Sequence, residues 1–463
     1  MSLASRTVHP DGMPLPIRYW AILTVGLGVT MAVLDSAIAN VALPTIARDL
    51  HTNPAFSIWI VNGYQLAIMI SLLPLSSLGD IIGYRRVYQA GLALFTVASL
   101  LCAFSHSLAL LTAARVIQGF GAAGIMSVNT AIIRFIYPHK QLGRGIGINA
   151  LVVAGSAAAG PTIASAILSI ANWPWLFAVN VPLGIVAFGI GMFALPITAR
   201  APHKFDFSGA ALSALTFGFL IASIDSLGHG ERVYIFAGEA VAAIVFGILF
   251  VRSQLEEAAP MLPLDLLRIP MFSLSVLTSV CSFIAQMLAF VALPFLMQLT
   301  LHFSAVETGF LVTPWPLATG IAATISGRLA DRYPAGVLGA GGLVLFAGGL
   351  FALALLPDHP AILDVIWRMA LCGLGFGTFQ SPNNRVLLSS APRERSGGAS
   401  GMLGSARLLG QTTGAALVAL MFGRFAPHAT TVALYTAAVI ALVAAFVSAL
   451  RLSDKARPKP LAV

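Results

Sequence analysis

The chain has 463 residues, of which 58% are hydrophobic and only 9% are charged, and its formal net charge is +9. A soluble domain of ordinary composition has about 25% charged residues. The polar surface is therefore too small to cover even one soluble domain, and the composition excludes a soluble protein. The basic excess does not indicate nucleic-acid binding, because lysine and arginine avoid the apolar segments and gather in alternate loops.

The apolar segments predict an all-α polytopic membrane protein. A transmembrane helix needs about 20 consecutive apolar residues. In chain order, this rule predicts fourteen spans, at residues 19–43, 57–78, 87–105, 108–133, 145–170, 175–195, 207–227, 233–251, 271–300, 308–328, 336–356, 361–386, 398–422 and 430–451. Twelve spans is the nearest alternative, because segment 271–300 and the proline-interrupted start of 308–328 have the weakest boundaries.

The distribution of basic residues predicts the orientation in the membrane. If the N-terminus is cytoplasmic, the inner segments contain 20 of the 26 basic residues, whereas the outer segments contain only Arg48, Arg232 and Arg424. This asymmetry follows the positive-inside rule. Because the number of spans is even, both termini are expected in the cytoplasm.

Three landmarks recur along the chain and predict a duplicated six-helix unit. The segment Leu78-Gly79-Asp80 recurs as Leu329-Ala330-Asp331, 251 residues later, and Arg115 has a counterpart in Arg368, 253 residues later. Arg144 and Arg395 form the third pair. The expected organisation is a cytoplasmic tail, a six-helix bundle, two inserted helices with a cytoplasmic loop, a second bundle and a second cytoplasmic tail, at 1–17, 18–195, 196–265, 266–451 and 452–463.

Asp35 is the most informative single residue, because it is a carboxyl group inside the first predicted span. Fifteen residues separate it from Trp20, which places it roughly 22 Å along the helix, deep in the outer half of the membrane. Such a group is costly unless it is paired, hydrated or protonated. We therefore predict that Asp35 binds and releases a proton; the alternative is a structural acid neutralised by one fixed partner.

Arg115 is the expected electrostatic partner of Asp35. Its helix runs inward from about Leu108, so Arg115 lies roughly 10 Å below the outer face, at a depth similar to that of Asp35. An interaction that depends on protonation would make the pair a proton relay. The alternative is that Arg115 only caps backbone carbonyl groups, and matching depth does not by itself show that the two helices touch.

Two further segments suggest conformational roles. The loop after the second span is expected to form a charged latch, and part of it returns in the second half; its candidate residues are Asp80, Gly83, Arg85, Arg86, Asp331 and Arg332. Gly160 and Pro161 lie in a run of small residues in the fifth span, where helices can approach closely and proline favours a kink. The alternatives are an ordinary positive-inside loop and ordinary close packing.

The chain resembles the fourteen-span drug:proton antiporters of the major facilitator superfamily, a branch of bacterial multidrug and quaternary-ammonium exporters. The resemblance covers nearly the whole chain and is carried by Leu34–Pro44, Gly79–Arg86, Arg115–Gly119, Gly155–Pro161 and Trp173–Pro182. The sequence departs from the family pattern at Ser76, at Pro174 and at Ser36-Ala37.

The resemblance implies two six-helix bundles plus two extra central helices, with the substrate site between the bundles near the middle of the membrane. It implies a location in the bacterial inner membrane. It also implies that Asp35 handles protons or cations, that Arg115 aids proton transfer, that the Asp80 loop gates, and that the helix with Gly160 and Pro161 is typical of antiporters.

Polar and aromatic residues inside otherwise apolar spans are the candidates for the substrate cavity. Flexible methionine and aromatic side chains suit lipophilic cations, although many such residues pack between helices or face lipid. The candidates are Trp59, Asn62, Tyr64, Gln65, Gln286, Met287, Phe290, Met297, Gln298, Trp315, Gln380, Asn383, Arg407 and Gln411. Glu239, in the inserted helices, is a weaker candidate for coupling.

The leading hypothesis is proton-coupled export of amphiphilic, mainly cationic compounds by a monomeric secondary transporter. The sequence has no catalytic constellation, no metal-binding histidine spacing and no Walker-type loop, so we expect no enzyme activity and no cofactor or metal, and a proton gradient is the expected driving force. The expected partners are lipophilic cations, protons and the bilayer. An alternative is export of an endogenous metabolite, amino acid or siderophore; an enzyme or a sensor would need features that the sequence lacks.

Overall fold

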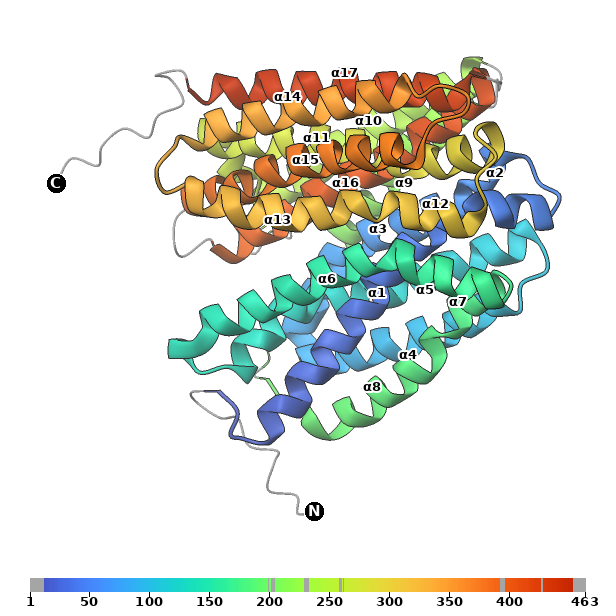
Figure 1. The fold of residues 1–463 in the computed structure, drawn as a ribbon. Coiled ribbons are helices and arrows are strands. Elements are labelled where there is room, and N and C mark those ends of the chain that lie inside the picture. The colour runs from blue at the N-terminus through green and yellow to red at the C-terminus, as the bar shows by residue number, and fades with distance from the viewer. Residues whose placement is uncertain are drawn as a thin grey trace. The chain divides into compact units, whose positions relative to one another are not determined.

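The computed structural model describes residues 12–198, 200, 205–228, 233–257, 260, 262–391, 396–425 and 428–452. Arg232, Arg395 and most of the two predicted tails lie outside these ranges. Within them, all regular secondary structure is helical (Figure 1), which confirms the all-α prediction.

Helices lie at all fourteen predicted spans. In chain order they are α1 (Ile17–Asp49), α2 with α3 (Pro54–Ser57, Trp59–Ile82), α4 (Tyr84–Ala103), α5 (Leu108–Ile136), α6 (Leu142–Ile170), α7 with α8 (Pro174–Ala178, Asn180–Ala194), α9 (Phe207–Gly228), α10 (Val233–Glu256), α11 (Pro270–Phe295) with η4 (Leu296–Thr300), α12 with α13 (Ala305–Val312, Pro314–Leu329), α14 (Ala335–Ala354), α15 (Ile362–Ser390), α16 (Ser396–Arg424) and α17 (Ala429–Leu450). The short helices η2 (His139–Gln141) and η3 (Leu264–Arg268) lie in connecting segments.

Among the described residues, twelve of these helical regions are long and apolar enough to cross a membrane. The other two are α12 with α13, which is interrupted at Thr313, and the glycine-rich α16. The interruption lies directly before Pro314, which has no backbone N–H to donate to the carbonyl group one turn earlier. The prediction of fourteen spans is therefore consistent with the structure.

Two of the long helices contain a proline near their C-terminal ends. The helix α1 continues through Pro44 to Asp49, six residues beyond the predicted end. The helix α11 contains Pro294, and the chain then changes to the π-helical segment η4, in which the Leu301 amide donates to the Leu296 carbonyl. Proline has no backbone N–H, so such a shift in hydrogen bonding keeps neighbouring groups paired.

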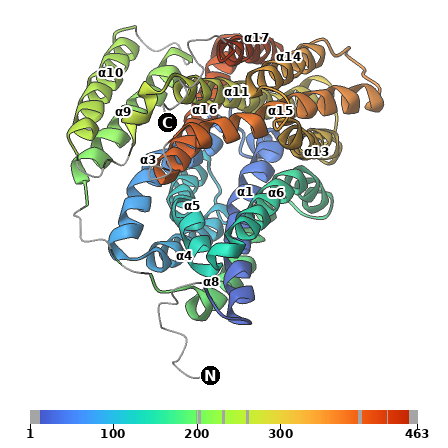
Figure 2. The ribbon, with the colours of Figure 1, turned by 90° about the vertical axis from the view of Figure 1, so that its left-hand side faces the viewer.

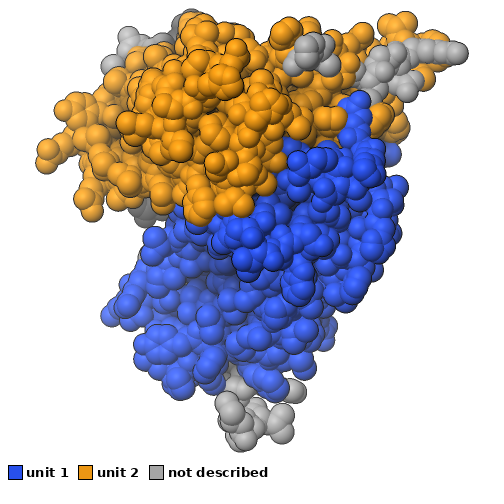
Figure 3. All heavy atoms as spheres, turned by 45° about the vertical axis from the view of Figure 1, so that its right-hand side comes forward, with its two compact units in different colours: residues 1–53, 59–217 blue, residues 54–58, 218–463 orange. Residues whose placement is uncertain are grey.

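The chain divides into two compact units, coloured separately in Figure 3. Unit 1 contains residues 1–53 and 59–217, and unit 2 contains residues 54–58 and 218–463. The division falls inside α9, and the predicted limits of the two bundles and the inserted segment stay a prediction.

The two units have the same internal arrangement (Figures 1 and 2). In unit 1, α3 and α4 pack along α5, and α1 packs against α6 and α8. In unit 2, α13 and α14 pack along α15, and α11 packs against α16 and α17. The helix α10 stands at the margin of unit 2 (Figure 2), with apolar side chains such as Ile244 and Ile248 exposed, as expected of a helix that faces lipid.

Glycines fix the close approach of the helices in both units. A Cβ atom at Gly119 of α5 would lie 2.5 Å from the Tyr64 carbonyl oxygen of α3. At Gly373 of α15, a Cβ would lie 2.2 Å from the Trp315 carbonyl oxygen of α13. Only glycine permits backbones to approach this closely, and this is the usual role of small residues between membrane helices. The duplication seen in the sequence is therefore also a duplication of packing.

The equivalent glycine contacts align the two units with each other, and this alignment corrects one predicted pair of residues. Gly119 and Gly373 are 254 residues apart, so position 115 corresponds to position 369 rather than to Arg368. Met369 is fully buried, whereas Arg368 is partly exposed and pairs with Asp364 one turn earlier on α15. The buried arginine of unit 1 therefore has no basic counterpart at the equivalent position of unit 2.

Candidate functional site

Asp35 lies at the centre of a buried polar network in unit 1. Its side chain is 1% exposed and lies at the contact of α1 with α5 and α8. The rest of α1 around it is apolar and buried, including Leu34 and Ile38. Asp35 is therefore inside the helix bundle and does not face acyl chains or an aqueous rim.

Three donors converge on the Asp35 carboxylate. One guanidinium nitrogen of Arg115 forms an ion pair with Oδ2. The side-chain amides of Gln118 and Asn180 both donate to Oδ1, each at 2.9 Å. Hydrogen bonds to a charged acceptor are shorter and stronger than those between neutral groups. The predicted partnership of Asp35 and Arg115 is present as a direct contact.

Arg115 is held in place from several sides. Its Nε donates to the Ile60 carbonyl of α3 at 3.1 Å, and its Nη1 donates to Gln118 Oε1 at 2.6 Å. Its guanidinium lies over the ring of Tyr64, 4.0 Å from the ring centroid, and 5.5 Å from the centroid of Phe177. Arginine stacks favourably on aromatic faces. The ring faces exclude water while the carbonyl and carboxylate oxygens balance the charge.

Gln118 connects the acid and the base. It lies one turn after Arg115 on α5, on the same face of the helix. Its Oε1 accepts from Arg115, and its Nε2 donates both to Asp35 and to Ser99 Oγ, the latter at 2.9 Å. Sequence analysis did not select Gln118 as a site residue. The three-residue spacing from Arg115 is the signal that could have found it.

Asn180 was also not predicted. It is the first residue of α8, directly after the break between α7 and α8 at Val179, and it is 1% exposed. Its Nδ2 donates to Asp35, whereas its Oδ1 has no partner among the described residues. An amide with one unpaired buried atom is unusual.

The carboxylate of Asp35 has about four acceptor sites, and its three contacts occupy two on Oδ1 and one on Oδ2. The donors come from α5 and α8. Through its carboxylate, α1 is therefore joined to both of these helices.

Two of the predicted substrate residues of α3 join the neighbourhood of this network. Tyr64 stacks on Arg115 and donates to the Ala32 carbonyl at 3.1 Å, and Gln65 donates to Ser36 Oγ at 3.4 Å. Asn62 is fully buried, and neither of its amide atoms has a partner in the part of the chain that the structure describes. Trp59 is partly buried at the start of α3.

Unit 2 brings some predicted substrate residues together and separates others. Trp315 is fully buried and its ring lies 4.7 Å from that of Phe290, between centroids. Asn383 instead joins a second polar network, in which it accepts from Arg451 at 2.7 Å and donates to Ser279 Oγ at 2.8 Å. Met287 and Met297 are buried, whereas the partly buried residues are Gln286, Gln298, Gln380, Arg407 and Gln411.

The predicted gating loop has a defined geometry. Gly83 has a φ of 101°, a backbone conformation that favours glycine, and it joins α3 directly to α4. Asp80 accepts a hydrogen bond from the Tyr84 hydroxyl, and Arg85 donates to the Met192 carbonyl. In this structure the partner of Asp80 is thus a neighbouring tyrosine.

In unit 2, Asp331 forms an exposed ion pair with Arg385 of α15, and Arg332 is exposed. In unit 1, Gly160 and Pro161 are buried in α6, and a Cβ at Gly160 would lie 2.5 Å from Ala37 Cβ. The helix α6 therefore touches α1 two residues after Asp35. The gating roles of all these residues stay predictions.

Glu239 is partly buried on α10 and its Oε2 has no partner among the described residues. Across those residues, no group of three or more His, Cys, Asp or Glu side chains is placed to hold a metal ion.

Comparison with known proteins identifies the family of this chain. The model of the Major Facilitator Superfamily matches residues 25–279 and 275–462. The chain is 60% identical over 449 residues to the uncharacterized transporter YebQ of Escherichia coli, covering 96% of this chain and 98% of YebQ.

Two relatives with assigned activities are more distant. The riboflavin transporter RibZ of Clostridioides difficile is 29% identical, with 88% of this chain and 89% of RibZ covered. The tetracenomycin C resistance and export protein of Streptomyces glaucescens is 32% identical, with 90% and 78% covered. With its helices, its internal repeat and its sequence all in agreement, the chain belongs to the major facilitator superfamily, as a multi-pass membrane transporter rather than an enzyme.

Proposed function

We propose that this transporter exports amphiphilic, mainly cationic compounds in exchange for protons, and that Asp35 is the proton-binding group. The observation that carries the proposal is the fully buried carboxylate of Asp35, with Arg115, Gln118 and Asn180 as its donors. A carboxyl group in the middle of a membrane bundle is costly and is characteristic of proton relays. Proton transfer through such a group needs neither a metal nor a nucleotide.

In the proposed cycle, Asp35 is ionised when the carrier is open to the cytoplasm, and its charge favours a bound cation. A proton from the outside then neutralises Asp35, which removes the attraction for the cation and frees Arg115 from its ion pair. The neutral carrier returns inward, where the proton leaves. Each proton that moves down its gradient contributes about 1.4 kcal/mol per pH unit and about 2.3 kcal/mol per 100 mV.

The substrate class rests on two supports. An acidic group that loses its charge during the cycle can attract and then release a cation. The partly exposed ring of Phe290, which packs on Trp315, offers aromatic surface for an apolar body. The tetracenomycin C export protein shares 32% identity with this chain. Export of a metabolite is the second candidate, because the riboflavin transporter RibZ is similar over nearly its whole length.

Proton movement in proteoliposomes tests the proposal. The wild type should release protons from the compartment that receives a lipophilic cation, as measured with a trapped pH-sensitive dye. Asp35→Asn should abolish this signal. Asp49→Asn, which changes an exposed carboxyl group at the end of the same helix, should leave it intact.

The outcomes separate the candidates. If Asp35→Asn remains folded and still couples cation entry to proton release, Asp35 is not the proton site. If protons move only when riboflavin or another neutral metabolite is added, metabolite export replaces drug export while the role of Asp35 stands.

A further inference from the structure

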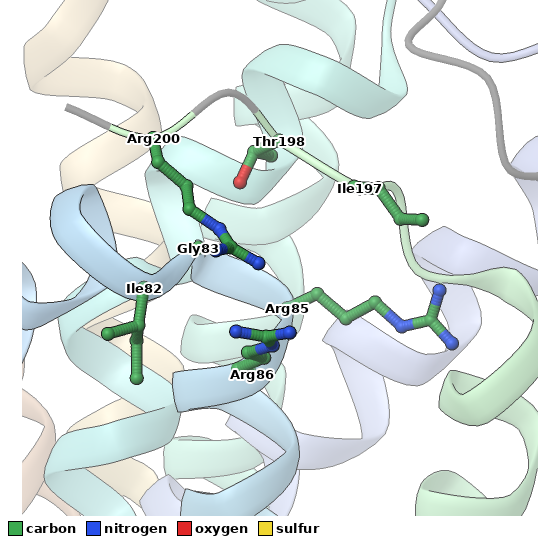
Figure 4. A pocket seen from close by; sticks show the side chains of 7 residues that line it. All are labelled: Ile82, Gly83, Arg85, Arg86, Ile197, Thr198 and Arg200. Atoms are coloured by element: carbon green, nitrogen blue, oxygen red, sulfur yellow. The ribbon is translucent and has the colours of Figure 1, made fainter.

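At the end of unit 1 where α3 meets α4, a pocket of about 280 Å³ opens beside the gating loop. Its walls come from the last turn of α3, the first turn of α4 and the segment that follows α8. Two isoleucines, Gly83 and Thr198 line it together with three arginines, Arg85, Arg86 and Arg200 (Figure 4). The polar network of Asp35 does not include any of these residues.

The local backbone builds this pocket. Because Gly83 adopts a positive φ, α4 begins directly after α3 and its first turn faces the pocket. The Tyr84 amide donates to Thr198 Oγ1 at 3.2 Å, which fastens the segment after α8 to the start of α4. The first turn of a helix carries partial positive charge from its N–H groups. The partial charge at the N-terminus of α4 and the charges of the arginine side chains are therefore all positive.

Two of the three arginines of the pocket have no acidic partner among the described residues. Figure 4 shows the side chains of Arg86 and Arg200 directed toward the same space, while Arg85 extends away from it, toward the Met192 carbonyl to which it donates. Neither Arg86 nor Arg200 pairs with a carboxylate within the described ranges. The carboxylate of Asp80, in the same loop, accepts from Tyr84. Two guanidinium groups that face one cavity repel each other unless an anion lies between them.

We propose that this pocket binds the phosphate group of an anionic phospholipid. The pocket lies at the common end of membrane helices, where lipid headgroups are found, and planar guanidinium groups match phosphate oxygens in pairs. Ile82 and Ile197 supply an apolar wall, and Ile197 is 42% exposed, as suits contact with the glycerol and the upper acyl chain. Bound lipid would join α3, α4 and the segment after α8 through a headgroup rather than through protein contacts alone.

Lipid binding to the purified full chain tests the inference. Native mass spectrometry would count molecules of phosphatidylglycerol and of phosphatidylcholine retained in titrations of wild type and of Arg86→Gln/Arg200→Gln. An arginine near anionic lipid strengthens binding roughly fivefold, so the double variant should bind phosphatidylglycerol roughly thirtyfold more weakly. The matched control is Arg144→Gln/Arg252→Gln, which removes two exposed arginines elsewhere and should bind like the wild type.

Three results would overturn the inference: equal retention of the two lipids by the wild type, unchanged phosphatidylglycerol binding by the double variant, or an equal loss in the control. A second experiment uses inorganic phosphate in place of lipid. If phosphate alone raises the melting temperature of the wild type but not of the double variant, the ligand is a free anion and the lipid assignment is wrong. Should the double variant fail to fold, Arg200→Gln, which changes an exposed residue outside the helices, gives the same test with a roughly fivefold loss.

Discussion

Replacement of Arg115 by methionine would isolate the energy held in the buried ion pair. Methionine is unbranched and uncharged and reaches about as far as the arginine Nε, and Met369 occupies the equivalent position of unit 2. The change removes the ion pair to Asp35 and the hydrogen bonds to Ile60 and Gln118. Asp35, which is 1% exposed in the wild type, then has only two amide donors to balance its charge.

Removal of one partner of a buried ion pair costs about 3–5 kcal/mol, because the other charge is left uncompensated. Asp35→Asn should cost a similar amount, since it leaves the Arg115 guanidinium buried. In Asp35→Asn/Arg115→Met both charges are gone, and the remaining defect is one poorly paired amide, worth about 1–3 kcal/mol. The double variant should therefore be more stable than the sum of the single changes predicts, by about 3 kcal/mol or more.

The assay is unfolding in mixed detergent micelles, followed by circular dichroism as the fraction of denaturing detergent rises. Arg144→Met, which changes an exposed arginine of the same unit, is the control and should shift the free energy of unfolding by no more than about 0.5 kcal/mol. Additive effects of the two single changes would refute the reasoning, because the pair would then hold no coupling energy. The reasoning would also be refuted if the single variants were as stable as the control.

Three other changes have defined outcomes. Gly121→Ala should cost about 1–3 kcal/mol in the same unfolding assay, because its Cβ would lie 2.5 Å from the Phe95 amide nitrogen, whereas Gly155→Ala should be tolerated, since no atom lies within 4 Å. Asn383→Leu should cost about 1–3 kcal/mol, because Arg451 loses a buried acceptor. Ser304→Ala should cost about 1 kcal/mol by loss of the N-cap of α12, visible as faster hydrogen exchange in its first turn.

Each of these predictions has its own contrary result. Equal stability of the two glycine variants would show that the helix contact at Gly121 is not tight. If Asn383→Leu weakened substrate binding without loss of stability, the residue would belong to a substrate site, as the sequence suggested, and not only to the network of Arg451. Unchanged exchange in Ser304→Ala would mean that the reciprocal hydrogen bonds with Glu307 do not hold the start of α12.

The spans and the two buried charges could be predicted from the sequence because lipid imposes strong constraints on both. A membrane helix must satisfy its own backbone hydrogen bonds, so apolar length alone identifies nearly every span. A charge in the hydrocarbon is so costly that Asp35 and Arg115 are conspicuous in their segments.

The amide partners and the exact register were decided by tertiary structure. Amides such as Gln118, Asn180 and Asn383 occur in several spans and cost less than a charge, so composition does not show which of them meet. The sequence likewise matched Arg115 with Arg368, whereas glycine contacts place Met369 at the equivalent point. Offsets along the chain differ between helices by a few residues, and a few residues on a helix change the face on which a side chain lies.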